Sequence, residues 1–171
     1  KDNYEGSHNE HFIPENGIHG RPDLQMEYMN IYASCNYSKG KKTSDQHCGE
    51  AKHDSKIDTN FLEKISCHIH FKYNTIGEIL PSCPFQTIKD CEINHSKLTL
   101  IQQEALKTIK VLNLNQASLV LLRKKDQTEL FKILNGLSKE KVNAQIQKLN
   151  NLDTFPRFID MLLYYMKQKK R

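Results

Sequence analysis

The sequence predicts an all-α fold in which a compact bundle of about five short helices follows a largely disordered amino-terminal arm. Charge and composition both divide the chain near residue 95. Residues 1–95 contain 10 Lys and Arg against 14 Asp and Glu, whereas residues 96–171 contain 15 against 6. All five Cys, all eight His, six of the seven Gly and four of the five Pro also precede Ser96. This contrast predicts a flexible linker arm at 1–95 and a helical domain at 96–171.

The arm is expected to be disordered because it holds few apolar residues. Asn, Ser, Lys, Asp, Gly and His dominate residues 1–59, and the mean hydropathy of the chain is −0.68. Such a segment cannot bury enough apolar surface to offset its ordering entropy. The weak helical pattern between Leu24 and Tyr32 is read either as a docking motif for a protein partner or as a transient helix without a role. Residues 61–93 are more apolar and could form a short helix or a hairpin.

The helical domain is expected to begin at Ser96 or Thr99. Thr99 and Gln102 have capping-box spacing, in which each side chain satisfies a backbone amide of the other residue. An apolar stripe at helical spacing follows. It consists of Leu98, Ile101, Ala105, Ile109 and Leu112.

Two further short helices are predicted between residues 116 and 134. Asn115 is placed to cap the first, which would run to about Lys125. Asp126 and Glu129 have a second capping-box spacing and would open the next helix, which would end at Asn135–Gly136. Ser138 is then expected to cap a helix with Val142, Ile146 and Leu149 on one face. A last helix, beginning around residues 153–156, would carry Phe158, Ile159, Leu162, Leu163 and Met166.

The turn at residues 134–138 is a candidate anion site. Backbone amides at the start of the helix after it lack helical partners and meet the positive end of the helix dipole. Lys139 and Lys141 flank this end, and Lys132 lies one turn before the hinge. A nucleic-acid phosphate is the common occupant of such a site, although an ordinary helix corner with solvated lysines fits the same spacing.

The same stretch resembles the helix-hairpin-helix family of DNA-binding domains. The similarity lies in residues 111–118 (Val-Leu-Asn-Leu-Asn-Gln-Ala-Ser), 134–138 (Leu-Asn-Gly-Leu-Ser) and 151–162. The helix before them looks like the arrangement in chromokinesin tails. The resemblance implies sequence-tolerant DNA binding through hairpin amides of Asn135, Gly136, Leu137 and Ser138, and a location on chromosomes, in the nucleus or on the spindle. The family hairpin has two glycines, and Ser138 replaces the second, which puts that contact in doubt.

Other basic residues support a polyanionic partner. Arg123, Lys124 and Lys125 form one cluster, and residues 167–171 form another that is read either as a phosphate contact or as a solvated terminus. The expected partner is double-stranded DNA or chromatin. No membrane contact is expected, because no stretch approaches the roughly 18 apolar residues that span a bilayer.

Neither a metal nor a cofactor is expected, and the chain is not expected to be an enzyme. No cysteine pair has Cys-x-x-Cys spacing, and scattered reduced thiols are favoured over zinc. The nearest metal-like grouping is His47 and Cys48 with Cys67, His68 and His70. Adjacent Cys and His on a flexible segment rarely hold catalytic geometry. Any motor or ATPase activity would lie outside this chain.

The leading hypothesis is therefore a DNA-binding or chromatin-binding tail domain of a larger chromosome-associated protein, possessing no activity of its own. One alternative is a helical protein-interaction module with an acidic partner. A second is a secreted protein with disulfides, which glycosylation-type sequons at Asn36 and Asn94 keep open.

Overall fold

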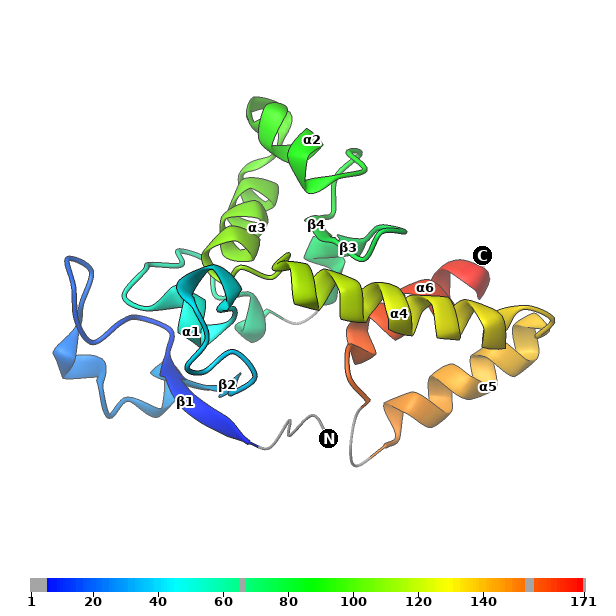
Figure 1. Ribbon diagram of the computed structural model, residues 1–171, viewed down its shortest axis with the longest axis horizontal. Helices are drawn as coiled ribbons and strands as arrows, with labels where there is room; N and C mark the ends of the chain where they lie inside the picture. The colour runs from blue at the N-terminus through cyan, green and yellow to red at the C-terminus, as the bar shows by residue number, and fades with distance from the viewer. Residues whose placement is uncertain (1–5, 65–66, 153–155, 171) are drawn as a thin grey trace.

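The computed structural model describes residues 6–64, 67–152 and 156–170, and it shows a mixed α/β fold (Figure 1). The all-α expectation is wrong, because the described chain includes two small antiparallel sheets of two strands each. The strands are β1 (Ser7–His11), β2 (Ile31–Cys35), β3 (Phe71–Tyr73) and β4 (Ile79–Pro81). The α-helices are α1 (Gly49–Lys52), α2 (Ile88–Ile93), α3 (Leu100–Val111), α4 (Ala117–Leu134), α5 (Lys139–Asn150) and α6 (Ile159–Lys170).

The expectation of a disordered arm is also wrong, since the described residues between Gly6 and His95 fold into strands, turns and short helices. Strands β1 and β2 pair in the register Ser7 with Cys35 and His11 with Ile31. Polar side chains do much of the ordering here. Asn30 is 5% exposed, and its side chain accepts from the Ile13 amide at 2.7 Å and donates to the Ile13 carbonyl at 3.0 Å. The composition led us to underestimate how ordered this segment is, because hydrogen bonds stabilise it in place of apolar burial.

The segment from Leu24 to Tyr32 is not one helix. It contains two single turns of 3-10 helix, Pro22–Leu24 and Tyr28–Asn30, followed by the start of β2. Met26, Tyr28 and Met29 are exposed. The segment is therefore an ordered loop whose end is tied to β1.

One hydrophobic cluster joins the second sheet to α2 and α3. Residues Phe71 and Tyr73 of β3 pair with Pro81 and Ile79 of β4. Leu80 of β4 is fully buried and packs with side chains from both sides of residue 95. The buried members of this cluster are Leu80, Cys83, Cys91, Leu98 and Leu106.

A second cluster forms where α4, α5 and α6 pack together. Its buried members are Leu130, Leu134, Val142, Ile146, Met161, Tyr165 and Met166. In Figure 1, α4 runs from the middle of the molecule toward the end where α5 and α6 lie, and the β1–β2 hairpin and α1 lie toward the other end. Across the described helices, none combines the length and apolar character needed to cross a membrane.

Three of the predicted helix ends are confirmed. Thr99 and Gln102 form the capping box that starts α3. Gly136 ends α4 with a φ of +90°, a conformation that glycine adopts without steric cost. The Ser138 hydroxyl accepts a hydrogen bond from the Lys141 amide at 3.4 Å at the start of α5.

The predicted break inside residues 116–134 is absent, because α4 is one continuous helix. Asp126 does not cap a helix there; its carboxylate accepts two hydrogen bonds from Arg157, at 2.7 and 3.0 Å. Nor does Asn115 cap α4, since its side chain binds the backbone of Ile79. One buried face at helical spacing explains the continuity. It consists of Leu119, Arg123, Gln127, Leu130 and Leu134. The start predicted for the last helix falls partly on residues 153–155, outside the described residues.

Candidate functional site

The β1–β2 hairpin and α1 form a unit held together by a buried lysine. Lys52 is 2% exposed, and its ammonium donates to Glu10 Oε1 at 3.1 Å, to the His11 carbonyl at 2.7 Å and to the His53 carbonyl at 3.3 Å. A buried ammonium is stable only when its donors are used in this way. These contacts join the end of α1 to β1 and fix the carboxylate of Glu10.

Gly49, the first residue of α1, makes room for that carboxylate. A Cβ atom at this position would lie 2.7 Å from Glu10 Oε2 and 2.7 Å from Ser34 Oγ. The Gly49 amide donates to the Ser34 hydroxyl at 2.9 Å, which fastens the start of α1 to β2. The absence of a side chain therefore allows Glu10 to lie against the helix start.

His8, Glu10 and Glu50 meet on one side of this unit. His8 Nε2 lies 3.7 Å from Glu10 Oε2 and 3.9 Å from Glu50 Oε1, and the three side chains are all half-buried. His8 Nδ1 lies 2.7 Å from Asn36 Oδ1, which can only accept, so Nδ1 carries a proton. In the neutral imidazole, the lone pair of Nε2 then faces two carboxylates. A nitrogen lone pair and two carboxylates this close together are stabilised by a cation between them, either a proton or a metal ion.

His11 is the second imidazole of the unit. Its Nε2 lies 2.9 Å from the Gln25 carbonyl oxygen, which only accepts, so Nε2 is protonated and Nδ1 carries the lone pair. Asn30 ties the chain just after His11 to the loop before β2, because its side chain binds Ile13 and the Leu24 carbonyl. The tautomer and the position of His11 are thus both defined by the fold.

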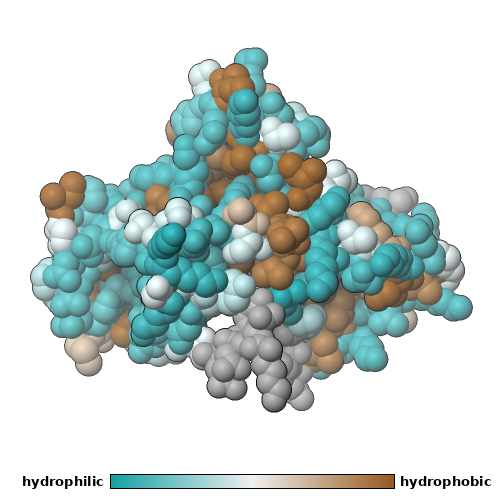
Figure 2. Space-filling view, in the orientation of Figure 1, coloured by the Kyte–Doolittle hydropathy of each residue, from teal (hydrophilic) through white to brown (hydrophobic). Residues whose placement is uncertain are grey.

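A cleft of about 920 Å³ opens beside this unit. Its lining includes Glu10, His11 and Lys52 of the unit and residues of α3 and α6, among them Thr108 and Tyr164. In Figure 2, most of the visible face is hydrophilic, with apolar patches over the start of α4 and at α2. A cleft with an imidazole, a carboxylate and an ammonium in its wall can bind and polarise a charged substrate.

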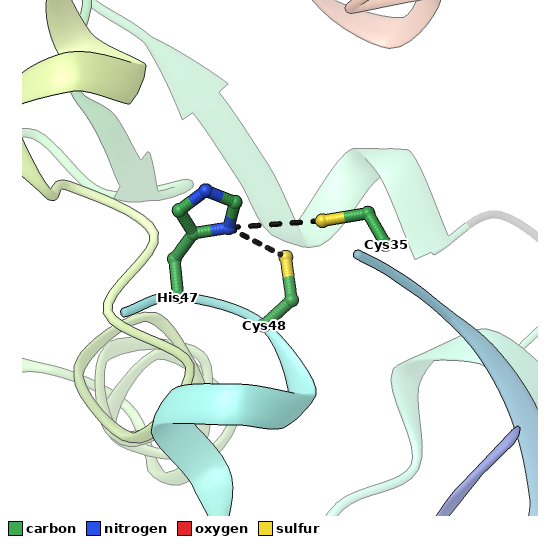
Figure 3. A group of neighbouring side chains, drawn as sticks. All are labelled: Cys35, His47 and Cys48. Atoms are coloured by element: carbon green, nitrogen blue, oxygen red, sulfur yellow. Dashed lines mark hydrogen bonds between the residues drawn. The ribbon is translucent and has the colours of Figure 1, made fainter. Parts of the chain in front are cut away.

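Three further ligand-type side chains meet where β2 ends and α1 begins. His47 Nδ1 lies 3.3 Å from Cys48 Sγ and 3.7 Å from Cys35 Sγ (Figure 3). Hydrogen bonds from the Cys48 thiol and from His47 lower the pKa of Cys35 to about 4. The hydrogen bond to Cys35, and then burial, raise the pKa of Cys48 well above the ordinary thiol value. One sulfur of the pair is therefore a thiolate at neutral pH.

The sequence pattern groups His47 and Cys48 with other residues as a metal-like cluster. The structure brings them to Cys35, and not to Cys67 and His68. Cys35, Cys48, Cys67 and His68 all line the large cleft. The sequence pattern does not include Cys35, because β2 and the loop after it bring together residues 12 positions apart. The adjacent His47–Cys48 pair is the one signal in the sequence that points here.

The residues predicted to bind DNA fall into two groups. Asn135, Gly136, Ser138, Lys139 and Lys141 are exposed where α4 meets α5, and Leu137 is half-buried there. Lys125 is exposed in the middle of α4. Lys132 is exposed and pairs with Glu129 at 2.8 Å.

Arg123 and Lys124 are engaged within the fold. Arg123 is 4% exposed; it donates to the Gly77 carbonyl at 2.6 Å and also to the Leu114 carbonyl. The ammonium of Lys124 donates to the Thr75 carbonyl. These two side chains connect α4 to the loop between β3 and β4, and Arg123 is not presented to solvent.

No family model matches this chain. The chain is 35% identical over 129 residues to a protein of Vibrio cholerae serotype O1 biovar El Tor named "Retron Vc95 putative HNH endonuclease". The match covers 74% of this chain and 54% of the relative, so the chain spans about half the length of that protein.

This relative corrects the expectation that the chain is not an enzyme, because its name is that of an endonuclease. A relative that acts on nucleic acid agrees with DNA binding in its general form. It does not agree with the tail of a chromosome-carrying motor, and no family model identifies one.

Proposed function

We propose that this chain carries the cleavage site of an endonuclease, formed by the β1–β2 hairpin and α1. The observation that carries this proposal is the arrangement of His11 at the cleft wall: its Nε2 donates to the Gln25 carbonyl at 2.9 Å, so that the basic Nδ1 is available beside Glu10. A relative named as an endonuclease supports the same interpretation.

His11 is the general base in this proposal. Its Nδ1 accepts a proton from a water molecule, and the water oxygen attacks the phosphorus of a phosphodiester. The bond from phosphorus to the leaving oxygen breaks, and that oxygen takes a proton from solvent. An imidazole suits this task because its pKa lies near neutral pH in the unperturbed side chain. The Gln25 carbonyl keeps the ring oriented and stabilises the imidazolium that forms.

His8, Glu10 and Glu50 would hold a divalent metal ion such as Mg²⁺ or Mn²⁺. The donors fit, because one imidazole nitrogen and two carboxylates are ligands that Mn²⁺ accepts, and carboxylates are the usual protein ligands of Mg²⁺. The ion, when bound, neutralises charge on the phosphate and acidifies bound water. Lys52 holds the Glu10 carboxylate in place through the 3.1 Å bond to Oε1.

The substrate we propose is double-stranded DNA, bound mainly through its phosphates. Residues 96–171 carry the excess of Lys and Arg. Lys139 and Lys141 are exposed at the start of α5, and Lys125 is exposed in the middle of α4. Lysine ammonium groups neutralise phosphates without reading bases, so binding should tolerate many sequences.

The test is cleavage of supercoiled plasmid DNA by the full protein in the presence of Mg²⁺ or Mn²⁺. His11→Ala should lower the rate by about a hundredfold or more, the usual contribution of a general base. His19→Ala is the matched control, because His19 is exposed in the segment between β1 and β2 and is not among the residues that line the cleft. Cleavage at the normal rate by the His11→Ala protein would refute the assignment of the base, and no cleavage with either ion would refute the nuclease itself.

A further inference from the structure

The group formed by Cys35, His47 and Cys48 has the dimensions of a tetrahedral metal site. Zinc binds thiolate sulfur at about 2.3 Å and imidazole nitrogen at about 2.0–2.1 Å, so ligands of one ion lie about 3.5–3.8 Å apart. His47 Nδ1 lies 3.3 and 3.7 Å from the two sulfurs, and the three ligand atoms all lie within 4.8 Å of one another.

Hydrogen bonding alone does not account well for this arrangement. Nδ1 of an imidazole has either one proton or one lone pair, so it can make one good hydrogen bond, yet two sulfurs approach it (Figure 3). A cation at the centre is shared by all three atoms at once. With a metal ion on Nδ1, the ring proton lies on Nε2, which has no hydrogen-bond partner among the described residues.

Several hydrogen bonds and a ring contact fix the position of His47 and of the backbone next to it. The Ser38 hydroxyl accepts from the His47 amide and donates to the His47 carbonyl, both at 3.0 Å. The His47 ring is 1% exposed and stacks on Tyr37 at 5.6 Å between centroids. Cys48 has a φ of +58°, and its amide donates to the Leu112 carbonyl at 2.8 Å. These contacts hold the His47 ring and the Cys48 backbone in fixed positions next to Cys35.

We propose that Cys35, His47 and Cys48 bind a zinc ion that joins the end of β2 to the start of α1. Two thiolates and one imidazole favour zinc over Mg²⁺ or Ca²⁺, which prefer oxygen. Three protein ligands leave the fourth position to a water molecule. Cys35 and His47 also line a second cavity of about 790 Å³, through which that water exchanges with solvent. The ion fastens together the same hairpin and helix that carry Glu10 and Glu50, and two of its ligands, Cys35 and Cys48, also line the cleft of the proposed cleavage site.

The direct test is the zinc content of the full protein, expressed in zinc-supplemented medium and measured by inductively coupled plasma mass spectrometry after desalting. One zinc per chain is expected. The double variant Cys35→Ser with Cys48→Ser should lose it, whereas the control Cys67→Ser should keep it. Zinc absent from the wild-type protein, or retained by the double variant, would overturn the proposal.

A second measurement on the wild-type protein avoids any folding defect of the variants. Thiols are alkylated before and after treatment with a zinc chelator, and the labelled cysteines are mapped by mass spectrometry. Cys35 and Cys48 should react many times faster after chelation, while Cys67 should react equally in both samples. A disulfide between Cys35 and Cys48, or equal labelling of both before and after chelation, would overturn the site.

The two proposals can fail separately. The His11→Ala protein should keep its zinc while losing cleavage. If the wild-type protein binds zinc but does not cleave DNA, the nuclease proposal fails alone; if it cleaves DNA with no zinc bound, the zinc site fails alone.

Discussion

The ammonium of Lys52 donates to Glu10 Oε1 at 3.1 Å across 42 residues of sequence, and this buried ion pair fixes α1 against β1. The same ammonium also binds the carbonyl of His11, the residue we propose as the general base. One side chain therefore connects the stability of the unit to the position of its reactive groups.

Replacing Lys52 with methionine should destabilise the protein and slow cleavage. Methionine keeps most of the apolar stem but leaves the half-buried Glu10 carboxylate and two carbonyls without their donor. The expected loss is about 2–4 kcal/mol in the free energy of unfolding. Urea unfolding followed by circular dichroism measures it. Lys42→Met is the control, because Lys42 is exposed and its replacement should change the stability little. A Lys52→Met protein as stable as the wild type would show that the Lys52–Glu10 ion pair does not stabilise the fold.

Gly49→Ala should impair cleavage more than stability. The new Cβ would lie 2.7 Å from Glu10 Oε2, so the carboxylate must shift from its place 3.7 Å from His8 Nε2. We expect a cleavage rate at least about tenfold lower, since small displacements of a positioned group are costly. Gly40→Ala is the control, because Gly40 has a φ of +74° and nothing within 4 Å. It should cost about 1 kcal/mol of stability and leave the rate unchanged. Equal rates for the two variants would contradict the steric argument.

Asp58 should contribute stability that depends on pH. Hydrogen bonds from Lys107 and Lys56 lower the pKa of its carboxyl from 3.8 to about 2. Because the folded-state pKa is lowered, the contribution is fully present above pH 3.8 and disappears as the pH falls toward 2.

Asp58→Asn tests this by comparison with the wild-type protein. The carboxylate is 36% exposed, so the difference should be at most about 1 kcal/mol at about pH 6, should shrink below about pH 4 and should be smaller in high salt. The measurement is the free energy of unfolding in urea at pH values from about 2 to about 7. A difference that stays constant over this range would mean that Asp58 acts by packing and not by its charge.

Lys139→Glu with Lys141→Glu should weaken DNA binding for all sequences alike. Removing one phosphate contact should reduce the slope of log K against log salt concentration by about 0.9, so the pair should reduce it by about 2. Fluorescence anisotropy with two unrelated duplexes at several salt concentrations provides both quantities. Lys89→Glu with Lys97→Glu makes the same charge change on α2 and the turn after it. If this control weakens binding equally, net charge and not the α4–α5 end is responsible.

Local signals in the sequence predicted local structure well. The capping box at Thr99, the left-handed glycine at Gly136 and the serine cap at Ser138 are all confirmed. Each depends on atoms within about four residues of one another, so the pattern of residue types is sufficient to predict it. The capping-box spacing at Asp126 failed because a contact with Arg157, 31 residues away, took the side chain.

The amino-acid composition gave a wrong prediction of disorder where the chain is ordered by polar contacts between residues far apart in the sequence. The segment from Gly6 to about residue 60 has few apolar side chains, yet Asn30, Ser34 and Lys52 are buried with their hydrogen bonds made inside the protein. Apolar content measures only one source of ordering free energy, which explains why this arm was expected to be disordered. The proposed site lies in that segment. The expectation of a chain without enzymatic activity is wrong because of the relative named as an endonuclease.

The amino-acid sequence was enough to define the helical character of residues 96–171, their positive charge and the chemistry that His, Cys and carboxylates could offer. Which of those side chains meet was settled by folding in three dimensions. Glu10 reaches Lys52, and Cys35 reaches His47, because β1, β2 and α1 pack together. Hydrogen bonds and ligand distances act over a few ångströms in space, and no spacing along a chain reports them for residues that a hairpin brings together.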